Sequence, residues 1–191
     1  MATEYPAAEF VGIDKVLLFP QTIRPANVTF KQIDVTHGLP FEDNTFDFVH
    51  IRLFLLAFNR EQWVACLQEI RRVTKPGGYV QLMEDDGDEV VREFASQVER
   101  MMNLNDQDPR LCEKLGELLS KNGFTPVEEV KRSVPLGKNT HFTFDTCKPL
   151  VIGIYHLTTE EQYQTLKHKW LESRRKSSNS TWFAAVGRNP A

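Results

Sequence analysis

The sequence of 191 residues contains no apolar run that approaches the roughly 20 residues needed to cross a bilayer. It also starts without the basic and apolar segments of a secretory signal peptide. Cysteine is scarce: Cys66, Cys112 and Cys147 are odd in number, widely spaced and outside any metal-ligand pattern. These absences predict an intracellular protein, in the cytoplasm or the nucleus, with reduced thiols, no metal and no membrane segment.

Neither sign of charge dominates the chain. The net charge is −3, with 41% hydrophobic and 26% charged residues, which is typical of a folded domain and argues against a general nucleic-acid binder. We interpret the basic group at Arg174, Arg175 and Lys176 as the solvated end of a helix. No repeat or linker divides the sequence, so we expect one domain over residues 1–191.

The clearest local pattern is a strand, a helix and a second strand between residues 44 and 84. Phe46 to Ile51 is apolar or aromatic at nearly every position, as in a central parallel strand covered on both faces. Asn59 is a suitable cap for the helix that follows. One apolar stripe runs along this helix at Trp63, Leu67, Ile70 and Val73. Pro76 and Gly77-Gly78 then end the helix and turn the chain into a strand at Tyr79–Met83. The pattern predicts a right-handed βαβ unit.

Two further short strands each finish in a carboxylate. Glu9 to Ile13 ends on Asp14, and Thr29 to Ile33 ends on Asp34. In an open α/β sheet, ligands bind beyond the carboxyl ends of the strands, where a carboxylate can accept hydrogen bonds from ribose hydroxyls or from an exocyclic amine. Taken singly, either aspartate is better explained as a turn former or a helix cap. Two aspartates that each follow a strand, one after the other along the chain, favour a nucleoside-binding site.

The runs that carry these features are EYPAAEFVGID, RPANVTF, IDVTHGLPFEDNTFDFVHIR and QEIRRVTKPGGYVQLME. They resemble the class I S-adenosylmethionine-dependent methyltransferases of fungal type, strongly up to Glu84 and more weakly beyond it. The resemblance implies an α/β, Rossmann-like sheet with helices on both faces, S-adenosylmethionine as cofactor and a small molecule as substrate.

The resemblance also implies which residues form the site. Asp14 holds the ribose hydroxyls, with Lys15 and Val16 bordering the adenine. Asp34 accepts a hydrogen bond from the adenine amine, with Val35 beside it. The floor between cofactor and substrate is lined by His50, Ile51 and Arg52. Of these, His50 is the candidate base and Arg52 the candidate group for orienting an anionic substrate, although a histidine at a strand end is more often structural.

One departure from the family is the absence of its first strand and glycine-rich loop. The ten glycines are scattered, and none forms such a loop. We therefore expect an N-terminally truncated domain that lacks a strand between the one ending at Asp14 and the one around Phe48. Two strand edges are then left unpaired. Either they close on each other, or a protein partner or second copy of the chain supplies the missing element, or the core is compromised.

The remainder of the chain predicts substrate-side elements. The acidic cluster that begins at Glu84 and Asp85 is interpreted as a solvated loop or helix start. We expect a helical segment at residues 93–122 with a break at 106–109, a strand at 124–134, helices at 142–155 and 160–175, and a last strand at 181–187. Two functions stay open: an active small-molecule methyltransferase, or a degenerate relative without catalysis that serves as an interaction module or is an incomplete gene product.

Overall fold

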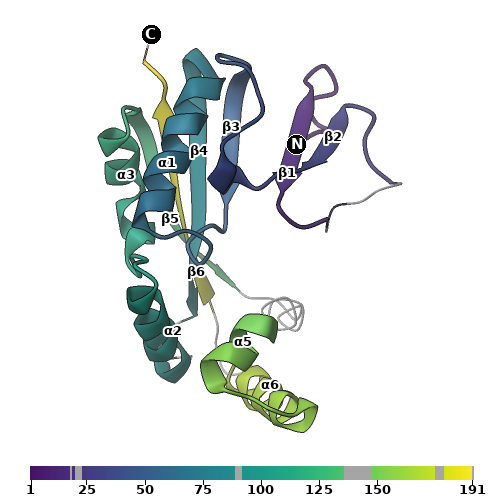
Figure 1. Cartoon of the computed structure of the whole chain (residues 1–191), viewed down its shortest axis with the longest axis vertical. Coiled ribbons are helices and arrows are strands. Elements are labelled where there is room, and N and C mark those ends of the chain that lie inside the picture. Colours follow the sequence, from purple (N-terminus) through teal and green to yellow (C-terminus); the bar gives the residue numbers. More distant parts are fainter. Residues whose placement is uncertain (18, 20–22, 89–91, 136–147, 175–178, 191) are drawn as a thin grey trace.

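Figure 1 shows a computed structural model of the chain. It describes residues 1–17, 19, 23–88, 92–135, 148–174 and 179–190. Its strands form two sheets. The first is a parallel pair, β1 (Phe10–Asp14) and β2 (Val28–Gln32). The second runs in the order β3-β4-β6-β5. Its strands are β3 (Phe46–Arg52), β4 (Thr74–Asp88), β5 (Thr125–Pro135) and β6 (Asn179–Arg188).

Helices connect these strands. They are α1 (Arg60–Val73), α2 (Arg92–Leu104), α3 (Leu115–Lys121), α5 (Lys148–Tyr155) and α6 (Glu160–Arg174), with short 3-10 turns η1 (Val35–His37) and η3 (Leu111–Lys114). The expected break within residues 93–122 is confirmed, because α2 and α3 are separate helices. Of the helix expected at 142–155, the first part lies outside the described residues. Among the described residues, no helix is long and apolar enough to span a membrane.

Helix α1 forms where the sequence predicts it. Asn59 and Gln62 make a capping box, in which the Asn59 side chain accepts from the Gln62 amide at 2.8 Å and the Gln62 side chain accepts from the Asn59 amide at 3.0 Å. The buried stripe of the helix is Trp63, Cys66, Leu67, Ile70 and Val73. It packs with residues of β3, β4, β6 and α3 in one hydrophobic core, so α1 and α3 cover the same face of the larger sheet.

The strand β3 differs from its prediction in one respect. Predicted as central, it lies at the edge of the four-stranded sheet, and within the described ranges it pairs with β4 alone, in parallel. Its side chains alternate: Ile51 is buried against α1, whereas Phe48, His50 and Arg52 are exposed. The apolar run therefore does not mark a strand covered on both faces, because Phe48 keeps 45% of its surface exposed.

The Pro-Gly-Gly segment makes a bulge at the start of β4. Between the pairs Phe46–Thr74 and Phe48–Tyr79 the register of β3 and β4 shifts. Gly77 has φ of +80°, and a Cβ on Gly78 would lie 2.9 Å from the Asp47 carbonyl oxygen, so this close approach needs glycine. The buried side chain of Asn189 donates to the Thr74 carbonyl at 2.8 Å and fixes the bulge to the end of β6.

The two sheets lie side by side in Figure 1, with β1 between β2 and β3. In the described part of the chain, β1 pairs only with β2 and β3 only with β4. The two unpaired edges expected between the strand ending at Asp14 and the strand around Phe48 are thus present. Strands β1, β2 and β3 run in the same direction in Figure 1, which brings their carboxyl ends to one side of the molecule.

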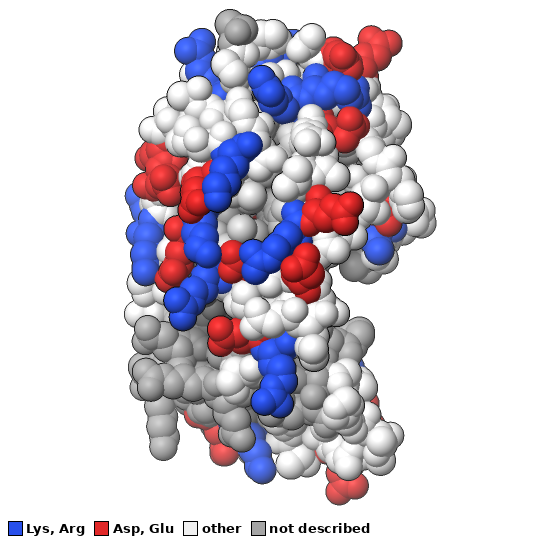
Figure 2. All heavy atoms as spheres, turned by 60° about the vertical axis from the view of Figure 1, so that its left-hand side comes forward, with Lys and Arg blue, Asp and Glu red and all other residues white. Residues whose placement is uncertain are grey.

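The predicted antiparallel edge is confirmed: β6 pairs antiparallel with both β4 and β5. Beyond it, α5 and α6 share a small core of their own around Val151 and Tyr163. Figure 2 shows that acidic and basic side chains intermix over the side of the molecule that carries α3 in Figure 1. Several of these charges pair, among them Lys121 with Glu117.

Candidate functional site

The candidate site lies where β1, β2 and β3 end. Asp14 is the last residue of β1, Asp34 follows β2 by two residues, and Arg52 is the last residue of β3. Because parallel strands place their carboxyl ends at one edge, this is where an open α/β sheet binds ligands.

Asp14 is exposed and shapes the turn that follows β1. Its side-chain Oδ1 accepts from the Val16 amide at 2.8 Å, which is an Asx turn. Its carbonyl oxygen accepts from the Ile33 amide at 2.9 Å, so the ends of β1 and β2 are joined there. The Lys15 carbonyl likewise accepts from the Gln32 side chain at 3.1 Å. The first aspartate is therefore held in place by backbone contacts and keeps its side chain at the surface.

Asp34 caps the turn η1. Its Oδ1 accepts from the Thr36 amide at 3.0 Å and from the Thr36 hydroxyl at 2.7 Å. These bonds, with a smaller contribution from the Lys15 ammonium at 3.7 Å, hold the pKa of Asp34 below its ordinary value. Asp34 is consequently ionised at neutral pH, and one of its oxygens is already used by the protein. Asp34 therefore serves as the cap of η1, and a role in ligand binding would come in addition to this one.

The other predicted residues divide between core and surface. Val35 packs against the hydrophobic core, and Ile51 is 6% exposed and belongs to that core. The Ile51 side chain thus faces the core, together with residues of α1. His50 and Arg52 are both exposed on the opposite face of the strand.

His50 is held by its neighbour on β4. Its Nδ1 lies 3.0 Å from Gln81 Oε1, and its ring stacks on Phe48 with centroids 6.5 Å apart. Desolvation of the ring lowers the pKa of His50 below 6.5, and the nearby Arg52 adds to this, against an opposing effect of the Gln81 hydrogen bond. Since Oε1 can only accept, Nδ1 carries the hydrogen and the lone pair lies on Nε2.

Comparison with known proteins bears on the fold. Residues 1–78 match the family described as methyltransferase domain. The demethylmenaquinone methyltransferase of Bacillus subtilis (strain 168) is 46% identical over 59 residues, which are 29% of this chain and 24% of that protein. The solved structure of the YcgJ protein from Bacillus subtilis superposes with a TM-score of 0.58 at 17% identity, covering 100% of this chain and 87% of that one.

A solved S-adenosylmethionine-dependent methyltransferase from Methanosarcina mazei superposes with a TM-score of 0.55 at 15% identity, covering 94% of this chain and 81% of that one. The chain has the class I methyltransferase fold. The resemblance drawn from the sequence and the α/β class are confirmed. The chain spans 24–34% of the length of the curated relatives it matches.

The sequence-based prediction for Glu84 is wrong. It places this residue in a solvated acidic cluster, but Glu84 is 0% exposed. Its carboxyl oxygens accept from the amides of Phe54 at 2.9 Å and Leu55 at 3.1 Å, in the loop directly beyond β3. Nothing in a run of acidic residues tells which one points inward. The alternation of β4, in which Val80 and Leu82 are buried, is the signal that places Glu84 on the same face.

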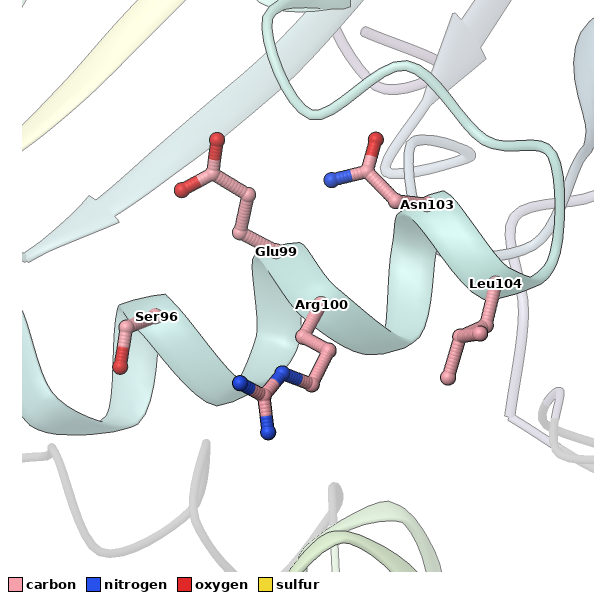
Figure 3. A pocket seen from close by; sticks show the side chains of 5 residues that line it. All are labelled: Ser96, Glu99, Arg100, Asn103 and Leu104. Atoms are coloured by element: carbon pink, nitrogen blue, oxygen red, sulfur yellow. The ribbon is translucent and has the colours of Figure 1, made fainter.

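Two surface hollows among the described residues lie away from the strand ends. Figure 3 shows one on α2, with Arg100 and Leu104 directed to one side of the helix and Glu99 and Asn103 to the other. A second is lined by residues of α6 and the turn before it. Neither is lined by a predicted site residue, and polar groups from different elements do not converge in them. They give no alternative to the strand ends as the ligand site.

Proposed function

We propose that this domain binds S-adenosylmethionine at the carboxyl ends of β1, β2 and β3 and transfers its methyl group to a small molecule. The observation that carries the proposal is the placement of Asp14 and Asp34 beyond adjacent parallel strands of a methyltransferase fold. Asp14 also keeps an exposed carboxylate, the acceptor that vicinal ribose hydroxyls require.

The acceptor groups and the apolar surface at the strand ends suit an adenosine group. Asp34 has its pKa lowered and is ionised, so it can accept from an exocyclic amine while Thr36 keeps its other contacts. Val16 is 48% exposed and Leu17 is 57% exposed, next to Asp14, and both offer apolar surface to a purine ring. Of the cofactor residues that the sequence predicts, these contacts support Asp14 and Asp34. Lys15, Val35, His50 and Ile51 stay predictions, and the Ile51 side chain lies in the core.

The bound cofactor supplies an electrophilic methyl group, whose transfer requires alignment of a nucleophile and exclusion of water. His50, neutral at pH 7 because of its lowered pKa, has the Nε2 lone pair with which to take a proton from an acceptor hydroxyl. Arg52, exposed two residues along the same face of β3, orients an anionic group of the acceptor.

For the acceptor we propose a small molecule with an apolar part. Leu53 and Leu56, just beyond β3, are 52% and 42% exposed, which gives the site an apolar border. The curated relatives are named as methyltransferases of demethylmenaquinone, which is consistent with such an acceptor. We further propose a cytoplasmic location, which the buried thiol of Cys66 supports. We also propose a protein partner or second copy at the unpaired edges of β1 and β3.

Asp14→Ala is expected to weaken S-adenosylmethionine binding about 10- to 100-fold, because two hydroxyl donors lose a charged acceptor. Isothermal titration calorimetry of the folded protein measures this. Glu172→Ala is the matched control: it removes an exposed carboxylate on α6, whose contact is a 3.5 Å pair with His168, and we expect unchanged affinity. Absence of binding in a well-folded sample, or equal affinity in the two variants, contradicts the proposal and favours the noncatalytic alternative.

A further inference from the structure

The inner edges of the two sheets, on β1 and on β3, are the feature that the proposed chemistry does not use. In the part of the chain that the structure describes, each of these strands pairs on one side only. The free side of β1 points away from β2 and towards β3 in Figure 1, and the free side of β3 points away from β4 and towards β1. Such an edge carries backbone amides and carbonyls that can pair with a further strand.

The hydrogen bonds between β1 and β2 show which residues of β1 point their backbone groups outward. In a parallel pair, the amide and carbonyl of one residue bond to the neighbouring strand, and those of the next residue point away from it. The Phe10 amide donates to the Asn27 carbonyl at 2.9 Å, so Phe10 and, two residues on, Gly12 bond to β2. The outward residues of β1 are therefore Val11 and Ile13.

The same alternation applies to β3. The Leu53 amide, directly beyond this strand, donates to the Met83 carbonyl of β4 at 3.1 Å. Val49 and Ile51 lie an even number of residues before Leu53, so they also bond to β4. The residues of β3 whose amides and carbonyls point outward are thus Phe48, His50 and Arg52. The two inner edges together present the groups that one extended segment lying between them can satisfy.

The inner edges also lack the features that discourage pairing at the outer edges. On the outer side of the larger sheet, β5 contains Pro126, Pro135 and, among other charged residues, Lys131. On the outer side of the smaller sheet, β2 contains Lys31. Proline removes an amide donor, and lysine keeps a strand edge in water. Neither residue type occurs in β1 or β3, so these edges are suited to being covered.

Apolar side chains accompany the outward backbone groups. Val11 of β1 and Phe48 of β3 are exposed. On the other face of β3, Val49 is partly buried and packs against the core. A segment between the strands would therefore meet apolar surface on both of its faces. Strands in that position carry consecutive apolar residues, in contrast to the alternating pattern of a half-exposed strand.

A second copy of the chain does not supply such a segment from its described strands. A segment that bridges β1 and β3 pairs on two sides, so both of its own edges must be free. Every strand in the described ranges already pairs with at least one neighbour. A described strand of a second copy can therefore extend one inner edge, but it cannot join the two.

We infer that the inner edges of β1 and β3 form a binding site for an extended, mainly apolar segment of a partner polypeptide. The segment pairs with both strands and joins the two sheets into one. Its paired part is about as long as β1, which has five residues, and is free of proline. One end of it lies between Asp14 and Arg52 and adds a wall to the ligand site. That consequence rests on the proposed function, whereas the pairing does not.

Selection from a phage-displayed library of random linear heptapeptides tests the inference on the full chain. We expect the enriched peptides to be apolar and free of proline. Hydrogen exchange is then measured with and without a synthetic copy of the most enriched peptide. We expect exchange to slow about tenfold or more at the outward amides, which are those of Val11, Ile13, Phe48, His50 and Arg52. The amides of Gly12 and Val49, which already bond within the sheets, should change less.

Val11→Pro removes one outward amide without breaking a bond to β2, and is expected to weaken peptide binding about 3- to 10-fold. Val11→Ala is the matched control, since it trims the side chain but keeps the amide, and its loss of affinity should be smaller. Fluorescence anisotropy of the labelled peptide measures both. A peptide with proline at its centre makes the same comparison on the wild-type chain, should Val11→Pro not fold, and is expected not to bind.

An unsuccessful selection, or a bound peptide that leaves the outward amides unchanged, overturns the inference. Slow exchange of these amides in the monomeric chain alone also overturns it, because the edges are then already covered. Slowing that follows dimer formation in analytical ultracentrifugation would identify a second copy instead of a partner. Titration with S-adenosylmethionine, with and without the peptide, separates the two claims: slowed exchange at the edges without cofactor binding in either sample removes the proposed function alone.

Discussion

Leu67→Ala is expected to lower the free energy of unfolding by about 3 kcal/mol, within a range of about 2–5 kcal/mol for buried leucines. Leu67 is 0% exposed at the centre of the core that joins α1 to β3 and β4. Removing its branched end loses apolar burial and leaves a cavity, because Ile51 and Val80 are fixed in strands. Urea denaturation followed by circular dichroism measures the change.

The control is Val64→Ala on the same helix. Val64 is 42% exposed, so its loss should change stability by less than about 0.5 kcal/mol. If Leu67→Ala costs no more than Val64→Ala, the helix does not pack on the sheet as described.

Arg72→Met is expected to lower the free energy of unfolding by about 2–3 kcal/mol, since several charge-assisted hydrogen bonds are lost together. The guanidinium donates to both oxygens of Glu69, at 2.9 and 2.7 Å, and to Asp43 at 2.8 Å. It also donates to the carbonyls of Leu39 at 2.9 Å and Phe41 at 2.8 Å. Arg72 thereby ties the end of α1 to the segment that leads into β3.

The same variant should alter the response to acid. The Arg72 hydrogen bonds, first, and the Leu39 amide lower the pKa of Glu69 from 4.5 to about 2. A lowered acid pKa contributes stability that is present above pH 4.5 and is lost as the pH falls towards 2. In Arg72→Met this loss should be smaller, because Glu69 then titrates nearer its ordinary pKa.

Lys121→Met is the matched control for Arg72. It also breaks an ion pair, with Glu117 at 2.6 Å, but both side chains are largely exposed. Such pairs contribute about 0–1 kcal/mol. Urea denaturation at pH 7 and pH 3 compares the two variants, and equal stability losses with parallel pH profiles would show that the Arg72 network is not structural.

The sequence predicted those parts of the fold whose causes are local. The capping pair Asn59 and Gln62 and the apolar spacing of Trp63, Leu67 and Ile70 specify α1 without reference to the rest of the chain. The strand that ends at Asp14 was also found, and β2 has the expected length but lies one residue earlier, so that it ends at Gln32. Short apolar runs bounded by polar residues can be recognised whatever the order of the strands in the sheet.

The parts that could not be predicted depend on contacts between distant segments. Asn189 fixes the bulge near Thr74, 115 residues earlier, and no pattern around either residue announces it. Likewise, the buried carboxyl group of Glu84 accepts from the amide of Phe54, in the loop beyond β3. That loop begins at Leu53, which has a left-handed conformation. The assignment of Phe46–Ile51 to a central strand failed for a similar reason, since neighbours in a sheet are set by topology.

For the candidate site, the sequence indicates which residues are candidates, but not which contacts their side chains make in the fold. Asp34 was considered both as a cap and as a ligand, and its bonds to Thr36 show the cap. Ile51 was expected to line the floor of the site, but strand alternation turns its side chain into the core. His50 and Arg52 stay at the surface of β3, where the proposed chemistry needs them.

The most direct test of the account is to locate the cofactor on the chain. Hydrogen exchange should be measured with and without saturating S-adenosylhomocysteine, which shares the adenosine group. The account predicts slower exchange at residues 14–16, 34–36 and 50–53, where β1, β2 and β3 end. Slowing confined to α6 or to the β5–β6 edge, with these three segments unchanged, would contradict it.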